Sequence, residues 1–143
     1  MASHMMLQGK VIAAGEATGK LLISSESLSF WGGYDFHTGT IIDKRHPLSG
    51  QSAVGRILAL PFTRGSSSTT AVLLEAIKAK TAPAAIITTQ PDAFFALASI
   101  VADEMYGTII PLIVLSKEDF LLLHKLLPMQ MLSIDKSGKV ETL

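Results

Sequence analysis

The chain has 143 residues, and twelve Lys and Arg balance twelve Asp and Glu, so its formal net charge is zero. That balance predicts no nucleic-acid or anionic-membrane partner, and the longest apolar runs are far shorter than the roughly 18 residues of a spanning helix. The absence of cysteine excludes disulfides and thiolate metal sites within the chain. Charged residues are only 17%, against about 25% in typical domains, which indicates a large core or a surface covered by a partner. We expect a cytoplasmic protein.

The first five residues, MASHM, are typical of an expression-vector scar, so the folded domain is expected to span residues 6–143. Between residues 7 and 23, two aliphatic stretches flank a glycine-bearing segment, which predicts two short strands. The segment GEATGK (Gly15–Lys20) between them lacks the spacing of a phosphate-binding loop, because only three residues separate its glycines and Leu21 follows the lysine. A hairpin turn is therefore expected there.

The stretch from Ser27 to Gly55 differs from the rest of the chain. It contains five glycines and the only tryptophan, Trp31. Only Thr40–Asp43 has a strand pattern, so the stretch is predicted to be mostly loop. Loops of this length in compact domains are usually functional or disordered, and the aromatic residues of FWGGYDF (30–36) argue against disorder.

The remaining chain alternates short apolar runs with amphipathic stretches. We expect strands at residues 56–61, 82–89 and 109–115, helices at 70–80, 91–107 and 116–128, and a final strand pair turning at Ser137–Gly138. The continuous apolar run at 82–89 is typical of a strand buried on both faces, and alternation with helices favours parallel pairing. The sequence thus predicts one α/β domain, with a β-rich N-terminal half and a C-terminal half of alternating strands and helices.

Hydroxyl side chains are concentrated in RGSSSTT (64–70), where the strand at 56–61 passes into a helix. Ser and Thr are favoured helix N-caps because their oxygens accept the unpaired amides of the first turn, yet a cap needs only one residue. No Glu stands three residues after any of the serines to form a capping box. The same amides favour an anion, and Gly65 admits a ligand close to the backbone. A helix cap and an anion-binding or catalytic turn therefore remain alternative interpretations.

The histidines and acids form no metal-ligand pattern. His37 and His46 lie in the loop and His124 lies within an apolar helix, so each is expected to be structural rather than a ligand. Acidic residues are scattered along the chain, and no spacing pairs them.

Several segments together resemble the small subunit, or swivelling domain, of the aconitase X enzymes. They are FWGG (30–33), TGTIID (38–43), HPLSGQS (46–52), the strand into RGSSS (64–68), and APAAII (82–87). The resemblance covers nearly the whole chain after the first five residues. It implies a swivel-type β/β/α domain, a large catalytic subunit as partner, and hydro-lyase chemistry that removes water from a small hydroxy acid. It also implies an iron–sulfur cluster carried by that large subunit, with no cofactor or metal bound by this chain alone.

In the wider aconitase superfamily, the first serine after the glycine of such a turn is the catalytic base, and the resemblance transfers this role to Ser66. As an alkoxide, Ser66 would take the proton alpha to the substrate carboxylate while the partner's cluster acts on the leaving hydroxyl. A serine base requires a water-excluded, amide-lined site. Arg64, Gly65, Ser67 and Ser68 would bind the anionic end of the substrate, although Ser68 stands where the aconitase turn carries an arginine.

Two substrate classes occur among the enzymes that the chain resembles. Bacterial members resemble cis-3-hydroxy-L-proline dehydratases, which form a pyrroline-2-carboxylate, whereas archaeal members resemble phosphomevalonate dehydratases with a turn that tends to read GSTVGS. GSSSTT (65–70) and the longer ADEMYGTIIP (102–111) are closer to the bacterial pattern. We therefore expect cis-3-hydroxy-L-proline as substrate, with mevalonate 5-phosphate as the alternative.

Two alternatives need no catalytic serine. One is a non-catalytic swivel or binding module, such as a phosphohistidine carrier, but such a carrier needs an exposed histidine at a helix start. His46 precedes a proline and His124 lies in an apolar run, so both fit that role poorly. The other is a scaffold whose partner performs all the chemistry. The role of the Phe30–Tyr34 loop is left open.

Overall fold

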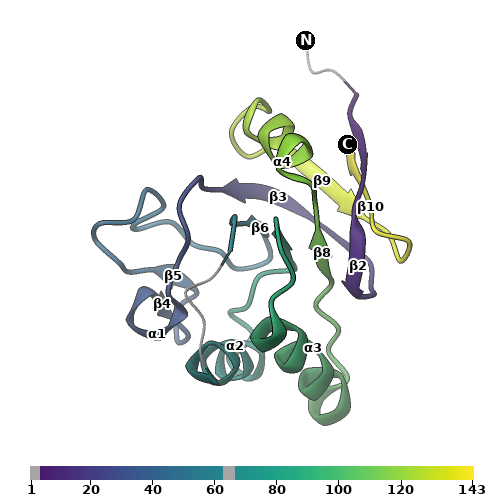
Figure 1. Cartoon of the computed structure of the whole chain (residues 1–143). Coiled ribbons are helices and arrows are strands. Elements are labelled where there is room, and N and C mark those ends of the chain that lie inside the picture. The colour runs from purple at the N-terminus through teal and green to yellow at the C-terminus, as the bar shows by residue number, and fades with distance from the viewer. Residues whose placement is uncertain (1–3, 63–66) are drawn as a thin grey trace.

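A computed structural model describes residues 4–62 and 67–143, and of Ser67 it describes the backbone alone. The strands within these ranges are β1 (Met6–Gln8), β2 (Lys10–Ala13), β3 (Ala17–Ile23), β4 (Tyr34–Asp35), β5 (Thr40–Ile41), β6 (Ile57–Ala59), β7 (Ala85–Thr88), β8 (Leu112–Val114), β9 (Met131–Ile134) and β10 (Lys139–Thr142). The helices are α1 (Phe30–Gly33), α2 (Ser67–Ala79), α3 (Ala93–Tyr106) and α4 (Lys117–His124). Figure 1 shows α2 and α3 together on one side of the sheet and α4 on the other.

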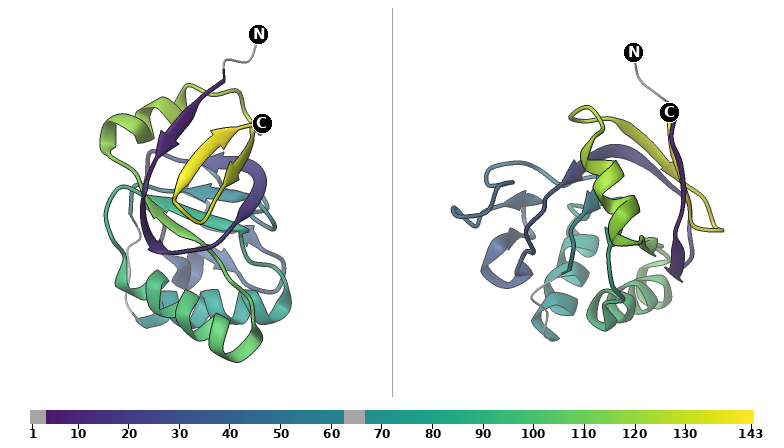
Figure 2. Two further views of the ribbon diagram at one scale, coloured as in Figure 1. Left: turned by 90° about the vertical axis from the view of Figure 1, so that its right-hand side faces the viewer. Right: turned by 45° about the horizontal axis from the view of Figure 1, so that its top comes forward.

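The main sheet closes into a barrel. Its strand order, over the described ranges, is β1-β10-β9-β3-β6-β7-β8-β2. β1 and β2 stand at the two ends of this order, yet only Gly9 separates them along the chain, so the sheet must curve until its edges meet (Figure 2). A side chain at residue 9 would overlap that of Ile113, and the Gly9 amide donates to the Gly138 carbonyl at 2.9 Å. Gly9 therefore lets β1 and β2 follow each other directly, so that β1 pairs with β10 at one edge of the sheet and β2 pairs with β8 at the other.

Parallel pairing in the C-terminal half is confirmed: β6 pairs parallel with β7, and β7 with β8. The hairpin predicted at Gly15–Lys20 is wrong, because β2 pairs with β8, while β3 pairs with β9 and β6. A short connection joins β2 to β3, yet these two strands do not pair with each other, and most of GEATGK is part of β3 itself. Glycine spacing marks a change of direction, but it does not tell which strands become neighbours.

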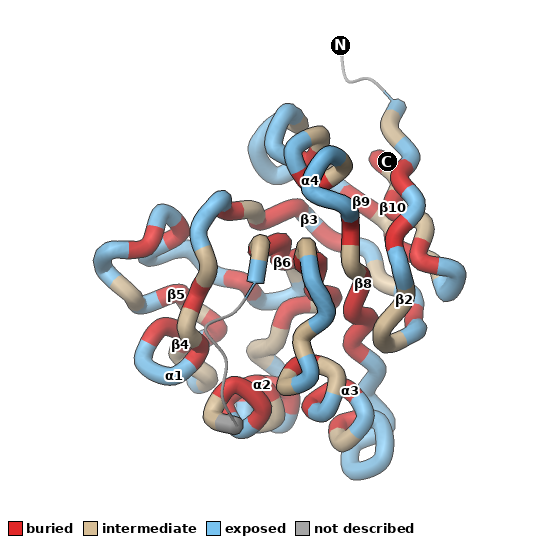
Figure 3. The backbone as a smooth tube through the Cα atoms, in the orientation of Figure 1, coloured by how far each residue is buried: buried red, intermediate tan, exposed pale blue. Residues whose placement is uncertain are grey.

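Alternate residues of the parallel strands face two hydrophobic clusters. In β6, Ile57 and Ala59 belong to a cluster inside the barrel, which Phe120 of α4 also joins. Leu58 and Leu60 belong to the cluster beneath α2 and α3. Each fully buried aliphatic side chain contributes about 1.5–3 kcal/mol. The buried positions along β6 and β8 are visible in Figure 3.

Helix positions are largely as predicted, and their ends differ. α3 has Asp92 as its N-cap, with the carboxylate accepting from the amides of Phe94 and Phe95, and Gly107 in the left-handed region as its C-cap. α2 begins at Ser67 rather than residue 70, so the serine run enters the helix. α4 ends at His124, before Pro128, and its N-cap Ser116 accepts from the amide of Asp119.

Residues 24–55 have little regular structure apart from α1, β4 and β5, as predicted for residues 27–55, and they are anchored to the core. The predicted strand at Thr40–Asp43 is shorter, with β5 at Thr40–Ile41 paired to β4. Phe30 and Tyr34 are buried with stacked rings 5.0 Å apart, whereas the neighbouring Trp31 is 71% exposed. The Tyr34 hydroxyl donates to the Thr81 carbonyl at 2.6 Å, just beyond the end of α2.

Met5, near the N-terminus, is hydrogen-bonded to the fold. Met5, which the sequence assigned to a scar, exchanges backbone and side-chain hydrogen bonds with Thr142 at the end of β10.

No helix in the described part of the chain is long and apolar enough to cross a membrane.

Candidate functional site

The carboxyl ends of the parallel strands meet at one edge of the barrel. The residues that follow them are Ser24 and Ser25 after β3, Leu60–Phe62 after β6, Thr89 and Gln90 after β7, and Leu115–Lys117 after β8. In parallel sheets, ligands bind preferentially outside these carboxyl ends, where loops from several strands converge. This edge is therefore where a site is expected.

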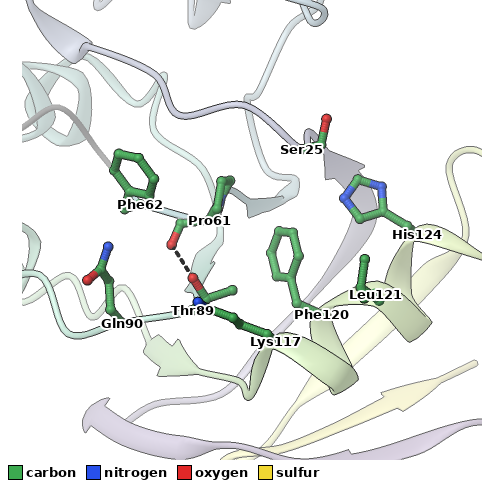
Figure 4. Close-up of a pocket in the computed structure, with 9 residues that line it drawn as sticks. All are labelled: Ser25, Pro61, Phe62, Thr89, Gln90, Lys117, Phe120, Leu121 and His124. Atoms are coloured by element: carbon green, nitrogen blue, oxygen red, sulfur yellow. Dashed lines mark hydrogen bonds between the residues drawn. The ribbon is translucent and has the colours of Figure 1, made fainter.

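A cavity of about 420 Å³ opens at this edge. Its lining comes from all four strand ends and from α4: Ser25, Pro61, Phe62, Thr89, Gln90, Lys117, Phe120, Leu121 and His124. Figure 4 shows Phe62 and Gln90 on one side and His124 with Leu121 on the other, with Phe120 between them. The cavity thus combines an apolar wall with a few polar side chains, which is the usual character of a small-molecule site.

The two central strand ends are held together by hydrogen bonds. The Thr89 amide and hydroxyl both donate to the Pro61 carbonyl, at 3.0 and 2.7 Å. The adjacent Thr88 hydroxyl donates to the Gln90 carbonyl at 2.7 Å. These bonds fix the backbone on which Pro61 and Phe62 line the cavity, immediately before residue 63.

The predicted catalytic turn has only part of its length in the described chain. Ser66, Arg64 and Gly65 lie outside the described residues, as does the side chain of Ser67. Ser68 is half-buried in the first turn of α2. The flanking residues are described: Phe62 lines the cavity and α2 begins at Ser67. The roles expected of these five residues stay predictions.

The threonines of the hydroxyl run belong to the packing of the helices. Thr69 and Thr70 are both buried. The Thr70 hydroxyl donates to the Phe94 carbonyl at 2.8 Å and so links α2 to the start of α3. Thr70 thus has a packing role that is neither helix capping nor anion binding. The choice between a helix cap and an anion-binding or catalytic turn therefore concerns only the serines.

His46 is structural, as predicted. It is buried, its Nδ1 accepts from the Leu48 amide at 3.1 Å, and its Nε2 lies 3.3 Å from the Glu26 carbonyl. This pairing assigns the proton to Nε2. His37 is exposed and packs against Phe36. His124, by contrast, lines the cavity with its ring edge against Phe120.

Sequence reasoning did not single out Lys117, Thr89, Gln90 or His124 as site residues. The signal available for three of them was position: Thr89 and Gln90 follow one buried strand, and Lys117 follows the next. Parallel strands deliver such residues to one edge. His124 had no such signal, because only the packing of α4 onto the barrel brings it there.

The chain's own residues do not fit an iron–sulfur cluster. Such clusters are held by cysteine thiolates, and the sequence has no cysteine. Within residues 4–62 and 67–143, no three His, Asp or Glu side chains come together where they could hold a metal ion.

Comparison with known proteins identifies relatives along most of the chain. A cis-3-hydroxy-L-proline dehydratase of Pseudomonas aeruginosa is 45% identical over 110 residues, which are 77% of this chain and 19% of that protein. A phosphomevalonate dehydratase small subunit of Methanothermobacter thermautotrophicus is 38% identical over 117 residues, 82% of this chain and 85% of that subunit. The chain thus spans about a fifth of the length of the Pseudomonas aeruginosa dehydratase.

The fold agrees with these relatives. The crystal structure of Thermococcus kodakaraensis aconitase X in its holo-form matches with a TM-score of 0.83 at 32% identity, over 97% of this chain and 98% of that one. A family model for the aconitase X swivel domain matches residues 6–142. The barrel and its two covering helices therefore have a known fold, and the chain belongs to the aconitase X swivel-domain family.

Proposed function

We propose that this chain, with residues 6–143 as its swivel domain, is the small subunit of an aconitase X dehydratase and supplies the serine base of that enzyme. The observation that carries the proposal is the cavity at the carboxyl edge of the barrel, whose wall at Pro61 and Phe62 leads into the predicted turn. Relatives named as dehydratases align over 77% and 82% of the chain. A swivel domain that contributes catalytic groups fits both facts better than a carrier or a scaffold.

In the proposed reaction, Ser66 removes the proton on the carbon next to the substrate carboxylate. The hydroxyl on the adjacent carbon leaves, the two carbons form a double bond, and the proton and hydroxyl together make one water. A serine acts as a base only where water is excluded and donors stabilise its anion. Phe62, Phe120 and Leu121 provide the apolar wall, and the N-terminus of α2, which begins at Ser67, favours a negative charge.

The remaining roles are divided between the two subunits. Arg64, Gly65, Ser67 and Ser68 are proposed to bind the substrate's anionic end. The family implies an iron–sulfur cluster, and because this chain lacks thiolates, we assign the cluster and the assistance to the leaving hydroxyl to the large subunit. No residue of this chain is assigned to the cluster.

The proposed substrate is cis-3-hydroxy-L-proline. The 45% identity to the Pseudomonas aeruginosa dehydratase exceeds the 38% identity to the phosphomevalonate dehydratase small subunit. Mevalonate 5-phosphate is the second candidate, because the chain covers 85% of that archaeal subunit and only 19% of the bacterial protein.

The test is to co-purify the chain with the large subunit from its source and to assay water loss from both substrates. Ser66→Ala should lower kcat by about 10²–10⁴-fold, the usual contribution of a general base, without weakening assembly. Ser133→Ala is the matched control, since its neighbours Leu132 and Ile134 are buried and Ser133 faces outward on β9.

Each outcome separates one part of the proposal. Full turnover by an assembled Ser66→Ala enzyme overturns the base. Activity on mevalonate 5-phosphate but not on cis-3-hydroxy-L-proline would make mevalonate 5-phosphate the substrate. Failure of the wild-type chain to assemble overturns its role as a subunit.

A further inference from the structure

A second surface adjoins the cavity at the carboxyl edge. A cavity of about 670 Å³ opens beside β3, and another of about 240 Å³ adjoins it. Both are lined by Gln51, Arg56 and Met129, so together they form one depression, which we call the Arg56 groove. Lys20 also lines it. Two cations therefore border one groove.

Arg56 is held in place by backbone carbonyls and forms no ion pair with the described carboxylates. Its Nη2 donates to the Leu21 carbonyl at 2.8 Å and its Nη1 to the Ser52 carbonyl at 3.4 Å. Its Nε is buried and has no hydrogen-bond partner among the described residues. No carboxylate in that part of the chain forms an ion pair with Arg56 or Lys20, and residues 1–3 and 63–66 contain no Asp or Glu. The chain itself thus leaves this charge uncompensated.

Desolvation makes that arrangement unfavourable without a partner. Burial lowers the pKa of the Arg56 guanidinium, the direction expected when a cation loses water without gaining a carboxylate. Half-buried arginines normally pair with planar anions, which their N–H fork matches in two hydrogen bonds. Each Nη nitrogen carries two N–H groups and gives one to a backbone carbonyl, so the guanidinium is held in place and keeps further donors for such an anion.

The rim of the groove is apolar and exposed. Val54, Leu127, Met129 and Met131 line it, and between 37% and 64% of each is accessible. Methionine and arginine are enriched at protein interfaces, where apolar side chains around a central polar anchor exclude water from it. This rim favours a protein surface over a free small anion as the occupant.

The groove is continuous with the candidate site. His124 lines both the cavity at the carboxyl edge and the smaller cavity of the Arg56 groove. A subunit that covers the carboxyl edge to exclude water therefore reaches this groove without a break. That continuity favours the same subunit, rather than a second copy of this chain, as the occupant.

We propose that the Arg56 groove is a docking site for the large subunit and that it receives an Asp or Glu side chain of that subunit on the Arg56 guanidinium. This inference rests on the proposed function for the identity of the partner. Arg56 acts in assembly and not in the chemical step.

The test measures the dissociation constant of the complex between this chain and the large subunit by calorimetry, together with kcat at saturating large subunit. Arg56→Gln should raise Kd by about 30-fold or more, as for a central interface residue, and leave kcat within about twofold of wild type. Lys20→Gln should have a smaller effect. Lys10→Gln, on β2 at the far end of the strand order, is the matched control.

A salt series separates docking from a purely structural role, since Arg56 also joins β3 to residue 52. The Kd of the wild-type complex should rise with sodium chloride, and that of Arg56→Gln should rise less, because the screened ion pair is missing. Arg56→Lys should recover the salt dependence and only part of the affinity, since lysine lacks the fork. A variant that weakens binding with an unchanged salt dependence would contradict the proposal.

The other outcomes are also decisive. If wild type assembles and Arg56→Gln binds equally well, this inference is wrong while the proposed function stands. If the chain alone self-associates and only that association depends on Arg56, the occupant is a second copy and the inference is again wrong. If wild type does not assemble at all, both proposals fail.

Discussion

The strand–helix alternation from β6 to β8 and the irregular residues 24–55 pack against the same hydrophobic cluster, but they are held there differently. In the alternating region, the backbone groups pair with one another in parallel ladders, and helix ends are satisfied by nearby caps such as Asp92. Residues 24–55 have only the short β4–β5 ladder among the named strands, and side-chain bonds tie them to Thr81 beyond the end of α2. The Tyr34 hydroxyl donates to the Thr81 carbonyl, and the Thr81 hydroxyl donates to the Phe36 carbonyl at 2.5 Å.

This difference determines where each region is sensitive to mutation. A ladder distributes its stabilisation over many equivalent bonds, so that no single surface residue dominates. An irregular segment concentrates stabilisation in a few anchors, and residues between anchors are free to serve another surface. Phe30 and Trp31 are adjacent examples, one fully buried and the other 71% exposed.

The largest expected effect tests that contrast within one dipeptide. Phe30 stacks on Tyr34 and meets Phe95 of α3 edge-on with ring centroids 5.1 Å apart. Phe30→Ala should lower the free energy of unfolding by about 3–5 kcal/mol, because it leaves a cavity in the core. Trp31→Ala should change it by less than about 0.5 kcal/mol. Urea unfolding of both variants measures this, and equal effects would show that residues 24–55 are not anchored as described.

A single hydrogen bond is the next test of the anchors. Tyr34→Phe removes the donor to the Thr81 carbonyl and should cost about 1–1.5 kcal/mol. Burial raises the pKa of the Tyr34 phenol above its usual value near 10. The neutral form is therefore the one that the fold stabilises, and this stabilisation is present below about pH 10 and declines as the pH rises above it. Wild type should lose more stability than Tyr34→Phe between about pH 9 and 11. Parallel curves would contradict the burial of this hydroxyl.

The alternating region could be predicted from sequence because its determinants are local. Continuous apolar runs indicated β7 and β8, and Asp92 with Gly107 delimited α3, all within one or two turns of chain. The pairing of β1 with β10 and of β2 with β8 was not predictable in this way. It depends on Gly9 fitting beside Ile113, a contact between residues far apart in sequence.

The candidate site was predictable in part for the same reason. The hydroxyl run at residues 64–70 stood out by composition, and its position after β6 is confirmed by the start of α2 at Ser67. Composition did not separate Thr70, which links α2 to α3, from the serines. His124 was expected to be structural, and Arg56 was only the first residue of a predicted strand, because neither belongs to a motif. Each acquires its setting only when α4 or the residues 24–55 pack onto the barrel.

A helix cap tests the locally determined region at smaller scale. Asp92→Ala removes the carboxylate that accepts from the amides of Phe94 and Phe95, at 3.0 and 3.1 Å. The expected loss is about 1 kcal/mol of unfolding free energy, the usual cost of a missing N-cap. Asp92→Ser restores an acceptor and should recover most of that loss. Thermal unfolding compares the three proteins, and a failure of serine to recover stability would show that the carboxylate acts through something other than capping.

The smallest effect concerns the turn between β9 and β10, a regular hairpin that is held in the manner of residues 24–55. Asp135 accepts from the Ser137 hydroxyl at 2.6 Å and from the amides of Ser137 and Lys139, at 2.9 and 3.1 Å. The Ser137 hydroxyl is the main cause of the lowered pKa of the Asp135 carboxyl. A lowered pKa in the folded state means that the charged form stabilises the turn above the ordinary Asp pKa of about 3.9, and that this contribution is lost as the pH falls below it. Asp135→Asn keeps the acceptor oxygen and removes only the charge, so it should be less stable than wild type near pH 6 and equal to it near about pH 2. If Asp135→Asn is still less stable than wild type near about pH 2, the effect comes from the geometry of the turn rather than from the charge of Asp135. The turn would then be stabilised mainly by its backbone, as the parallel strands are, and not by side-chain bonds, as residues 24–55 are.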